Sequence, residues 1–142
     1  IFHDLAPHQL DIMYWLFGDA KKIGGYSRNL GGHYAADDTV NGNILFANGI
    51  EFDGDWNFNA TDSKDHCEIN GSKGKLAFNF FEPPVIKITA DGQTTQINFE
   101  QLQHVQQPMI ERVVQYFLGN ETNPCSGEEG ARVMRWMESF RN

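Results

Sequence analysis

Clusters of positive charge are missing from this sequence. Its 11 lysines and arginines are outnumbered by 19 aspartates and glutamates and are scattered singly, which gives a formal net charge of −8. Because binding to nucleic-acid phosphates needs clustered positive charge, we expect no nucleic-acid partner. Long apolar runs are also missing. No stretch approaches the roughly 20 apolar residues of a membrane span, so we expect no transmembrane segment.

Cysteine is scarce. Only Cys67 and Cys125 occur, and without a C-x-x-C pair their spacing predicts neither a redox motif nor a thiolate metal site. We therefore expect no metal site. Two isolated thiols are typical of a reducing compartment, which favours a cytoplasmic protein. Inert structural thiols and a disulfide between them both remain open.

The chain also lacks the motifs that most often identify an enzyme. It contains no G-x-G-x-x-G, no complete P-loop, no G-x-S-x-G and no H-E-x-x-H. Without a glycine-rich turn to hold a pyrophosphate, we expect the isolated chain to bind no nicotinamide cofactor and to be inactive. The chain begins with Ile1 and shows no signal peptide. We interpret it as a piece of a longer protein, whose own signal peptide stays an open question.

Sequence patterns predict one helix at the start of the chain and two in its C-terminal part. The first helix is expected over residues 4–17, with Asp4 as its cap, Pro7 in its first turn and Gly18 at its end. Pro108 is expected to open a second helix. Ser126 and Glu129 form a capping-box pattern that predicts a third.

Between residues 21 and 100 the pattern has the period of strands. Asn48-Gly49 is a strong hairpin signal, and Asn70-Gly71 and Asp91-Gly92 predict two further reversals. Successive hairpins of this kind predict an antiparallel meander. We therefore expect one α+β domain over residues 1–142, with a largely antiparallel, open-faced sheet and helices packed on one face.

The first predicted helix carries a polar stripe. At 100° per residue, Asp4, His8, Asp11 and Trp15 fall within a sector of about 60°, whereas the opposite side is apolar. We therefore expect the helix to be largely buried apart from this stripe. A histidine between two carboxylates can accept and release a proton near neutral pH, which makes His8 a candidate acid/base.

Two other interpretations of the stripe are open. It could be a solvated face with incidental charges, although such faces usually carry lysine and glutamate. His8 could instead be a structural histidine that ties the helix to a strand. The remaining histidines are isolated in sequence, and their roles are not predicted: His3, His33, His66 and His104.

The sequence resembles the Gfo/Idh/MocA family, named for glucose–fructose oxidoreductase, inositol dehydrogenase and rhizopine catabolism. Residues 4–11 match the D-x-x-x-H-x-x-D segment that opens the family's C-terminal domain, and residues 15–18 match the following W-x-x-G. Residues 37–40, 69–76 and 124–130 are also similar and stand in the family's order.

The resemblance implies a glyceraldehyde-3-phosphate dehydrogenase-like C-terminal domain that lies downstream of a Rossmann domain binding NAD or NADP. It implies a carbohydrate-like substrate such as a sugar, cyclitol or related polyol. Asp4 would hold substrate hydroxyls, Asp11 would assist in substrate binding, and His8 with Asp4 would form the catalytic pair. A lysine of the missing domain would also take part. Ala6 and His3 depart from the usual family residues.

Self-association is a further expectation. Several strands carry apolar residues on both faces, as Leu76 and Phe78 do with Ala77 between them, and helices cannot cover both faces of one sheet. A large exposed apolar patch usually marks an interface, so we expect a homo-oligomer through the sheet. The open alternative is a monomer whose free sheet face is solvated, with Glu51, Asp53 and Asp55 on it. Two alternatives to the dehydrogenase remain: an NAD-dependent glycoside hydrolase domain of the same fold, and a non-catalytic sugar-binding or oligomerisation module.

Overall fold

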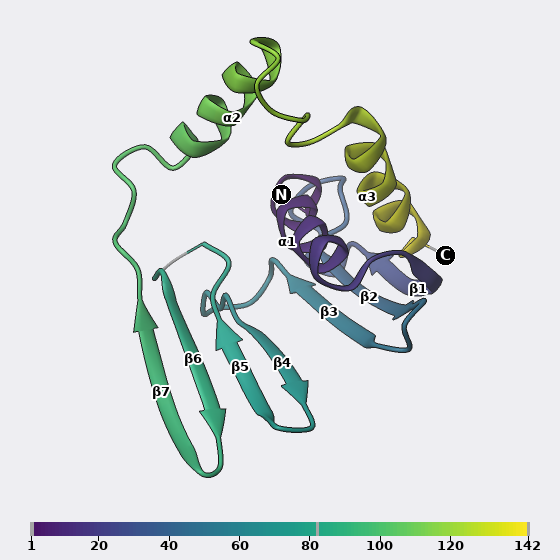
Figure 1. Ribbon diagram of the computed structural model, residues 1–142. Helices are drawn as coiled ribbons and strands as arrows, with labels where there is room; N and C mark the ends of the chain where they lie inside the picture. Colours follow the sequence, from purple (N-terminus) through teal and green to yellow (C-terminus); the bar gives the residue numbers. More distant parts are fainter. Residues whose placement is uncertain (1, 82, 142) are drawn as a thin grey trace. The chain divides into compact units, whose positions relative to one another are not determined.

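The computed structural model describes residues 2–81 and 83–141 (Figure 1). The chain divides into two compact units. Unit 1 contains Ile1–Thr61 and Cys125–Asn142, so it joins the two ends of the chain, and unit 2 contains Asp62–Pro124.

Unit 1 is a three-stranded antiparallel sheet with two helices. The sheet has the order β1 (Ala20–Arg28), β2 (Thr39–Phe46) and β3 (Glu51–Asn57). Helices α1 (Phe2–Phe17) and α3 (Gly127–Ser139) lie side by side and pack on this sheet (Figure 1). Chain segments more than 100 residues apart therefore share one core.

The core of unit 1 follows the period-two pattern of β2. Val40, Ile44 and Phe46 are buried on the side that faces the helices. Gly42 lies on the same side, and the ring of Phe140 fills the space where a Cβ would stand. Trp56 stacks on that ring at 5.9 Å between centroids. An aromatic cluster from β2, β3 and the end of α3 therefore joins the sheet to the helices.

Two details of α1 differ from the expectation. The helix begins at Phe2, so Asp4 lies in its first turn instead of capping it, and Pro7 lies one turn further in. The predicted extent of burial is also wrong. Only one face is buried, formed by Phe2, Ala6, Leu10 and Met13, because α3 and the sheet cover that side alone.

Unit 2 is a four-stranded antiparallel meander with one helix. The sheet has the order β4 (Cys67–Gly71), β5 (Gly74–Phe78), β6 (Val85–Ala90) and β7 (Gln93–Asn98). Helix α2 (Gln107–Phe117) follows it and has no buried residue.

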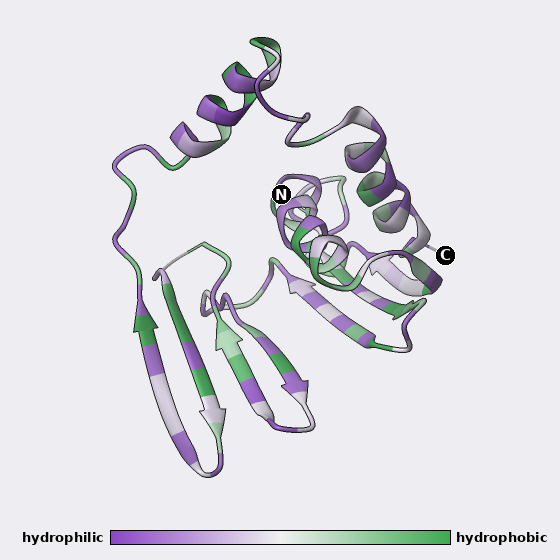
Figure 2. Ribbon diagram, viewed as in Figure 1, coloured by the Kyte–Doolittle hydropathy of each residue, from purple (hydrophilic) through white to green (hydrophobic). Residues whose placement is uncertain are grey.

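The sheet of unit 2 has one polar and one apolar face. Strand register places Glu68, Ala77, Lys87 and Gln96 opposite one another on the polar face. Figure 2 shows the resulting alternation of hydrophobic and hydrophilic residues along β6. The apolar face comprises Cys67, Ile69, Leu76, Phe78, Ile86, Ile88 and Ile97. None of these side chains is buried in the described chain.

The predicted α+β class is confirmed, with all strand pairs antiparallel. The expected continuous meander is instead divided into two sheets, because the polar segment between Asn57 and Cys67 forms no strand. The Asn48-Gly49 and Asp91-Gly92 turns are confirmed. The other reversal falls two residues later than predicted, at Ser72-Lys73. The capping box of Ser126 and Glu129 is confirmed. None of the described helices could cross a membrane.

Candidate functional site

The polar stripe lies on the exposed side of α1. Asp4, His8, Asp11 and Trp15 are all exposed to solvent, opposite the buried residues of the same helix. Trp15 is 81% exposed, which is unusual for the largest apolar side chain. Because regular helix geometry fixes these four positions, the stripe is presented on a rigid element.

The face beside the stripe is apolar and only partly covered. Ile12 and Leu16 are both more than one-third exposed. With Trp15 they form an apolar patch at the C-terminal half of α1, next to the acidic and imidazole side chains. A surface that combines apolar area with a few polar groups is typical of a binding site.

Asp11 lies beside the other end of the chain. Burial raises the pKa of the Cys125 thiol, and the negative charges of Asp11 and Glu129 raise it further. Glu129 accepts hydrogen bonds from the backbone N–H and hydroxyl of Ser126 at the start of α3. The segment before α3 therefore borders the stripe, although the two are far apart in sequence.

Both cysteines are thiols, so the disulfide alternative is not formed. Burial raises the pKa of Cys67 to about 11, with a further contribution from the charge of Asp65. A thiol with so high a pKa has little thiolate at neutral pH and is a poor nucleophile.

The strongest electrostatic feature of unit 1 is Asp38, which the sequence interpretation missed. Its carboxylate is fully buried and accepts hydrogen bonds from the backbone N–H groups of Leu30 and Gly31, at 2.9 and 2.8 Å. Burial alone would raise the pKa of Asp38, but these bonds and those from Asn59 and Thr39 outweigh it and lower the pKa to about 2. Asp38 thus fixes the long loop between β1 and β2.

We expect Asp38→Asn to lower the melting temperature near pH 7. The two backbone N–H groups bind different oxygens of the carboxylate, and in the amide one of these oxygens is replaced by an NH2 group that cannot accept. Since the folded-state pKa lies below the unfolded value of about 3.9, the carboxylate stabilises the fold above pH 4. This contribution is lost as the pH falls from about 4 through about 2. Thermal unfolding should therefore show a difference between wild type and variant that shrinks over this range.

The matched control is Asp37→Asn, which removes the same charge one residue away. Among the described residues, Asp37 accepts one side-chain hydrogen bond, from the Ser27 hydroxyl, so its loss should have the smaller effect. An equal loss of stability in the two variants would show that Asp38 has no special role.

The other four histidines do not belong to the stripe. His3 is on α1 but packs its ring edge-to-face against Phe2, at 5.4 Å. His33 belongs to the loop between β1 and β2, whereas His66 and His104 belong to unit 2. The described residues contain no group of three or more histidine, cysteine or acidic side chains placed to hold a metal ion.

Comparison with known proteins places this geometry in a family. The family model described as the GFO/IDH/MocA C-terminal domain matches residues 1–77, which include α1 and the whole sheet of unit 1. A protein of Formosa agariphila named as an oxidoreductase is 43% identical over 141 residues. That match covers 98% of this chain and 42% of the relative.

Solved structures share the fold. UDP-N-acetylglucosamine 3-dehydrogenase of Acidithiobacillus ferrooxidans superposes with a TM-score of 0.83 at 15% identity, over 97% of this chain and 44% of that one. Aldose–aldose oxidoreductase of Caulobacter crescentus superposes with a TM-score of 0.79 at 13% identity, over 98% and 43%. The chain thus spans less than half the length of each of these relatives.

Proposed function

This chain belongs to the Gfo/Idh/MocA family as an oxidoreductase C-terminal domain, and we propose that it is the substrate-binding part of an NAD- or NADP-dependent dehydrogenase. The proposed substrate is a sugar, cyclitol or related polyol. The observation that carries the proposal is the exposed Asp4, His8 and Asp11 stripe on α1, within the residues that match the family. Relatives of the same fold are named as sugar oxidoreductases, which supports the substrate class.

The chemistry assigns a separate task to each side chain. Oxidation of a carbinol removes a hydride from carbon and a proton from the hydroxyl, leaving a carbonyl group. The nicotinamide, held by a Rossmann domain outside this chain, would supply the hydride acceptor. His8 would take the hydroxyl proton, and Asp4 and Asp11 would hold substrate hydroxyls so that the reacting atoms are aligned.

The exposed apolar patch of Ile12, Trp15 and Leu16 fits this arrangement. We propose that the rest of the protein and the bound substrate cover it, so that water is excluded from the reacting groups. An aromatic ring beside hydrogen-bonding carboxylates also suits a sugar, whose C–H faces are apolar and whose hydroxyls are polar.

Cofactor titration tests the assignment of this chain to the substrate half. Binding of NADH and NADPH is followed by fluorescence for the full-length protein and for the 142-residue chain. The full-length protein should bind at micromolar concentration, whereas the chain alone should show no saturable binding because it lacks a glycine-rich turn. Saturable binding by the chain alone would defeat the assignment.

We also propose that the protein self-associates through the apolar face of β4–β7. In unit 1, by contrast, the sheet face away from the helices carries polar residues such as Asn41, Asn43 and Asp53 around the half-buried Leu45. The apolar face of unit 2 is the larger of the two candidate interfaces, and its side chains Ile88 and Ile97 are about 40% exposed. When two copies of a protein associate through the same face, the usual product is a dimer with two-fold symmetry.

We expect light scattering to give a dimer mass for the protein and a smaller mass for Ile88→Lys, which places a charge on the apolar face. Thr89→Lys is the matched control, because it adds the same charge on the polar face of the same strand. It should leave the dimer intact. A mass that corresponds to a monomer for the wild type at high concentration would exclude this interface.

A further inference from the structure

The loop between β1 and β2, residues 29–38, is held in a defined shape by its own polar groups. The Asn29 side chain accepts a hydrogen bond from the backbone N–H of Gly32 at 2.8 Å and donates one to the backbone carbonyl of Tyr34. The buried Asp38 carboxylate binds two further backbone N–H groups of the loop. These bonds fix the loop although it contains two adjacent glycines.

The largest side chains of this loop lie outside the core. Leu30 is 66% exposed, Tyr34 is 44% exposed, and His33 between them is also exposed. Binding residues are often found on loops that a rigid scaffold positions. A tyrosine is well suited to such a role, because its ring offers a large contact area at a low cost in conformational entropy.

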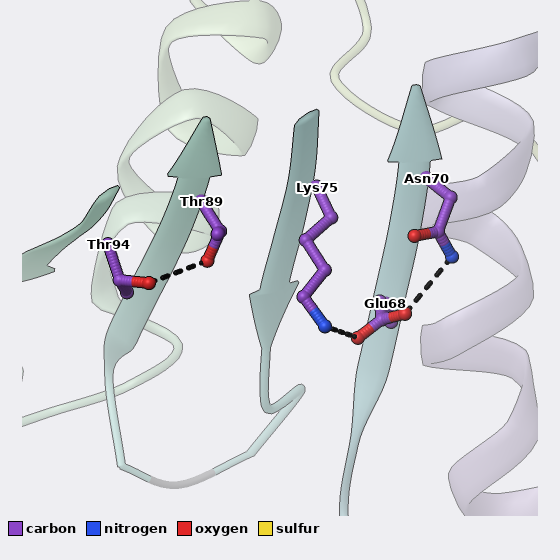
Figure 3. A network of polar contacts seen from close by, with 5 residues as sticks. All are labelled: Glu68, Asn70, Lys75, Thr89 and Thr94. Carbon is purple, nitrogen blue, oxygen red and sulfur yellow. Dashed lines mark hydrogen bonds and ion pairs between the residues drawn. The ribbon is translucent and has the colours of Figure 1, made fainter. Parts of the chain in front are cut away.

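Polar side chains on the sheet of unit 2 are arranged differently, because they bind one another. Lys75 forms an ion pair with Glu68 at 2.9 Å, and the hydroxyl oxygens of Thr89 and Thr94 are 2.9 Å apart (Figure 3). That network ties neighbouring strands together. The exposed ring of Tyr34 instead extends from a loop whose backbone is already fixed.

The loop lies at the end of the sheet where α1 begins. Phe2 packs edge-to-face on Trp56 at 5.2 Å between ring centroids, and the Gln9 side chain accepts a hydrogen bond from the indole N–H of Trp56. Trp56 is paired with Val40, which is only two residues beyond the loop. The first half of α1 therefore packs at the end of the sheet from which the loop extends.

Contacts at the other end of α1 agree with this direction. Asn48, in the turn between β2 and β3, donates a hydrogen bond to the backbone carbonyl of Phe17 at 3.0 Å. The last turn of α1 thus lies at the opposite end of the sheet from the loop (Figure 1). Asp4 and His8 belong to the first half of α1, so they lie at the same end of unit 1 as the loop.

We propose that this loop contacts the substrate, with Tyr34 as a specificity-determining residue and Asp38 as the residue that positions the loop. The inference rests on the dehydrogenase function proposed above. Tyr34 would place its ring against the C–H face of a sugar or cyclitol ring, and its hydroxyl would bind a substrate hydroxyl. This contact is remote from the oxidised carbon, so it would stabilise the bound substrate and the transition state equally.

Steady-state kinetics of the full-length protein test the role of Tyr34. The substrate is the best-oxidised member of a panel of glucose, galactose, mannose, xylose and myo-inositol, with NAD or NADP. Tyr34→Ala should raise KM by about tenfold or more and change kcat by less than about twofold, because the lost contact is equal in the two states. His8→Ala should instead lower kcat.

Tyr26→Ala is the matched control. Tyr26 is also 44% exposed, but it is paired with Asn41 on the sheet face away from the helices. Its removal deletes the same side chain from the same unit, far from the first half of α1. KM and kcat should both stay within about twofold of the wild type.

The positioning role of Asp38 has a separate signature. Asp38→Asn, assayed well below its melting temperature, should raise KM because the loop is no longer held in place. A purely structural effect would reduce the active fraction, which lowers the apparent kcat at an unchanged KM. Asp37→Asn should change KM less than Asp38→Asn does.

The inference is overturned, and the proposed function stands, if Tyr34→Ala oxidises the substrate with the KM of the wild type. It is also overturned if Tyr26→Ala raises KM as much as Tyr34→Ala, or if Asp38→Asn lowers kcat at an unchanged KM. A wild-type protein that oxidises no member of the panel would contradict the proposed function itself, and the inference would fail with it.

Discussion

Replacing His8 with alanine in the full-length protein is expected to lower kcat by about 10²–10⁴, the usual contribution of general acid–base catalysis. The alanine variant has no group to take the hydroxyl proton as the carbonyl forms. His8 is exposed on α1 and is not part of the buried core, so the fold should be unaffected. Affinity for the cofactor should also stay the same, because that site lies outside this chain.

Steady-state kinetics with a matched histidine variant check this result. His104→Ala removes an exposed imidazole from unit 2 and should leave kcat unchanged. Added imidazole should partly restore turnover to His8→Ala, because it can replace the missing base; a structural histidine would not respond. A purified His8→Ala variant with near-normal turnover would show that His8 has no catalytic role.

The second large effect concerns stability. Phe140→Ala is expected to lower the free energy of unfolding by about 3–5 kcal/mol, as measured by denaturant titration. The ring of Phe140 is fully buried, stacks on Trp56 and occupies the space above Gly42. Its removal leaves a cavity where α3 meets the sheet. Because domains are stable by only about 5–15 kcal/mol, unit 1 would become marginal.

Phe117→Ala is the control for this prediction. It deletes the same side chain from α2, where the residue is 79% exposed. The free energy of unfolding should change by no more than about 0.5 kcal/mol. Similar losses for the two variants would mean that burial of Phe140 does not stabilise unit 1.

Local signals explain which elements were predictable. The capping box of Ser126 and Glu129 and the two-residue turn at Asp91-Gly92 depend on neighbouring residues alone, and both were found in place. The division of the strands into two sheets depends on which strands pair over long distances. Hydrophobic periodicity does not report that pairing, since β3 and β4 each have a regular strand pattern.

Local sequence patterns were limited in the same way for the candidate functional site. The Asp4, His8 and Asp11 stripe could be predicted because helix periodicity places the three residues on one face. The position of Asp11 next to Cys125 could not, because it results from the packing of the two chain ends. The role of Asp38 was missed for a similar reason. A pair of aspartates, Asp37-Asp38, was its only signal, and the two backbone N–H groups that Asp38 binds belong to a loop seven and eight residues earlier.

Net turnover of the full-length protein tests the central proposal most directly. The protein is incubated with NAD or NADP and a panel of free sugars, cyclitols and glycosides. Formation of reduced cofactor is measured together with the products by mass spectrometry. The proposed dehydrogenase should give one reduced cofactor for each sugar or polyol oxidised. Cleavage of a glycoside with no net reduction of the cofactor would contradict it and identify a hydrolase of the same fold.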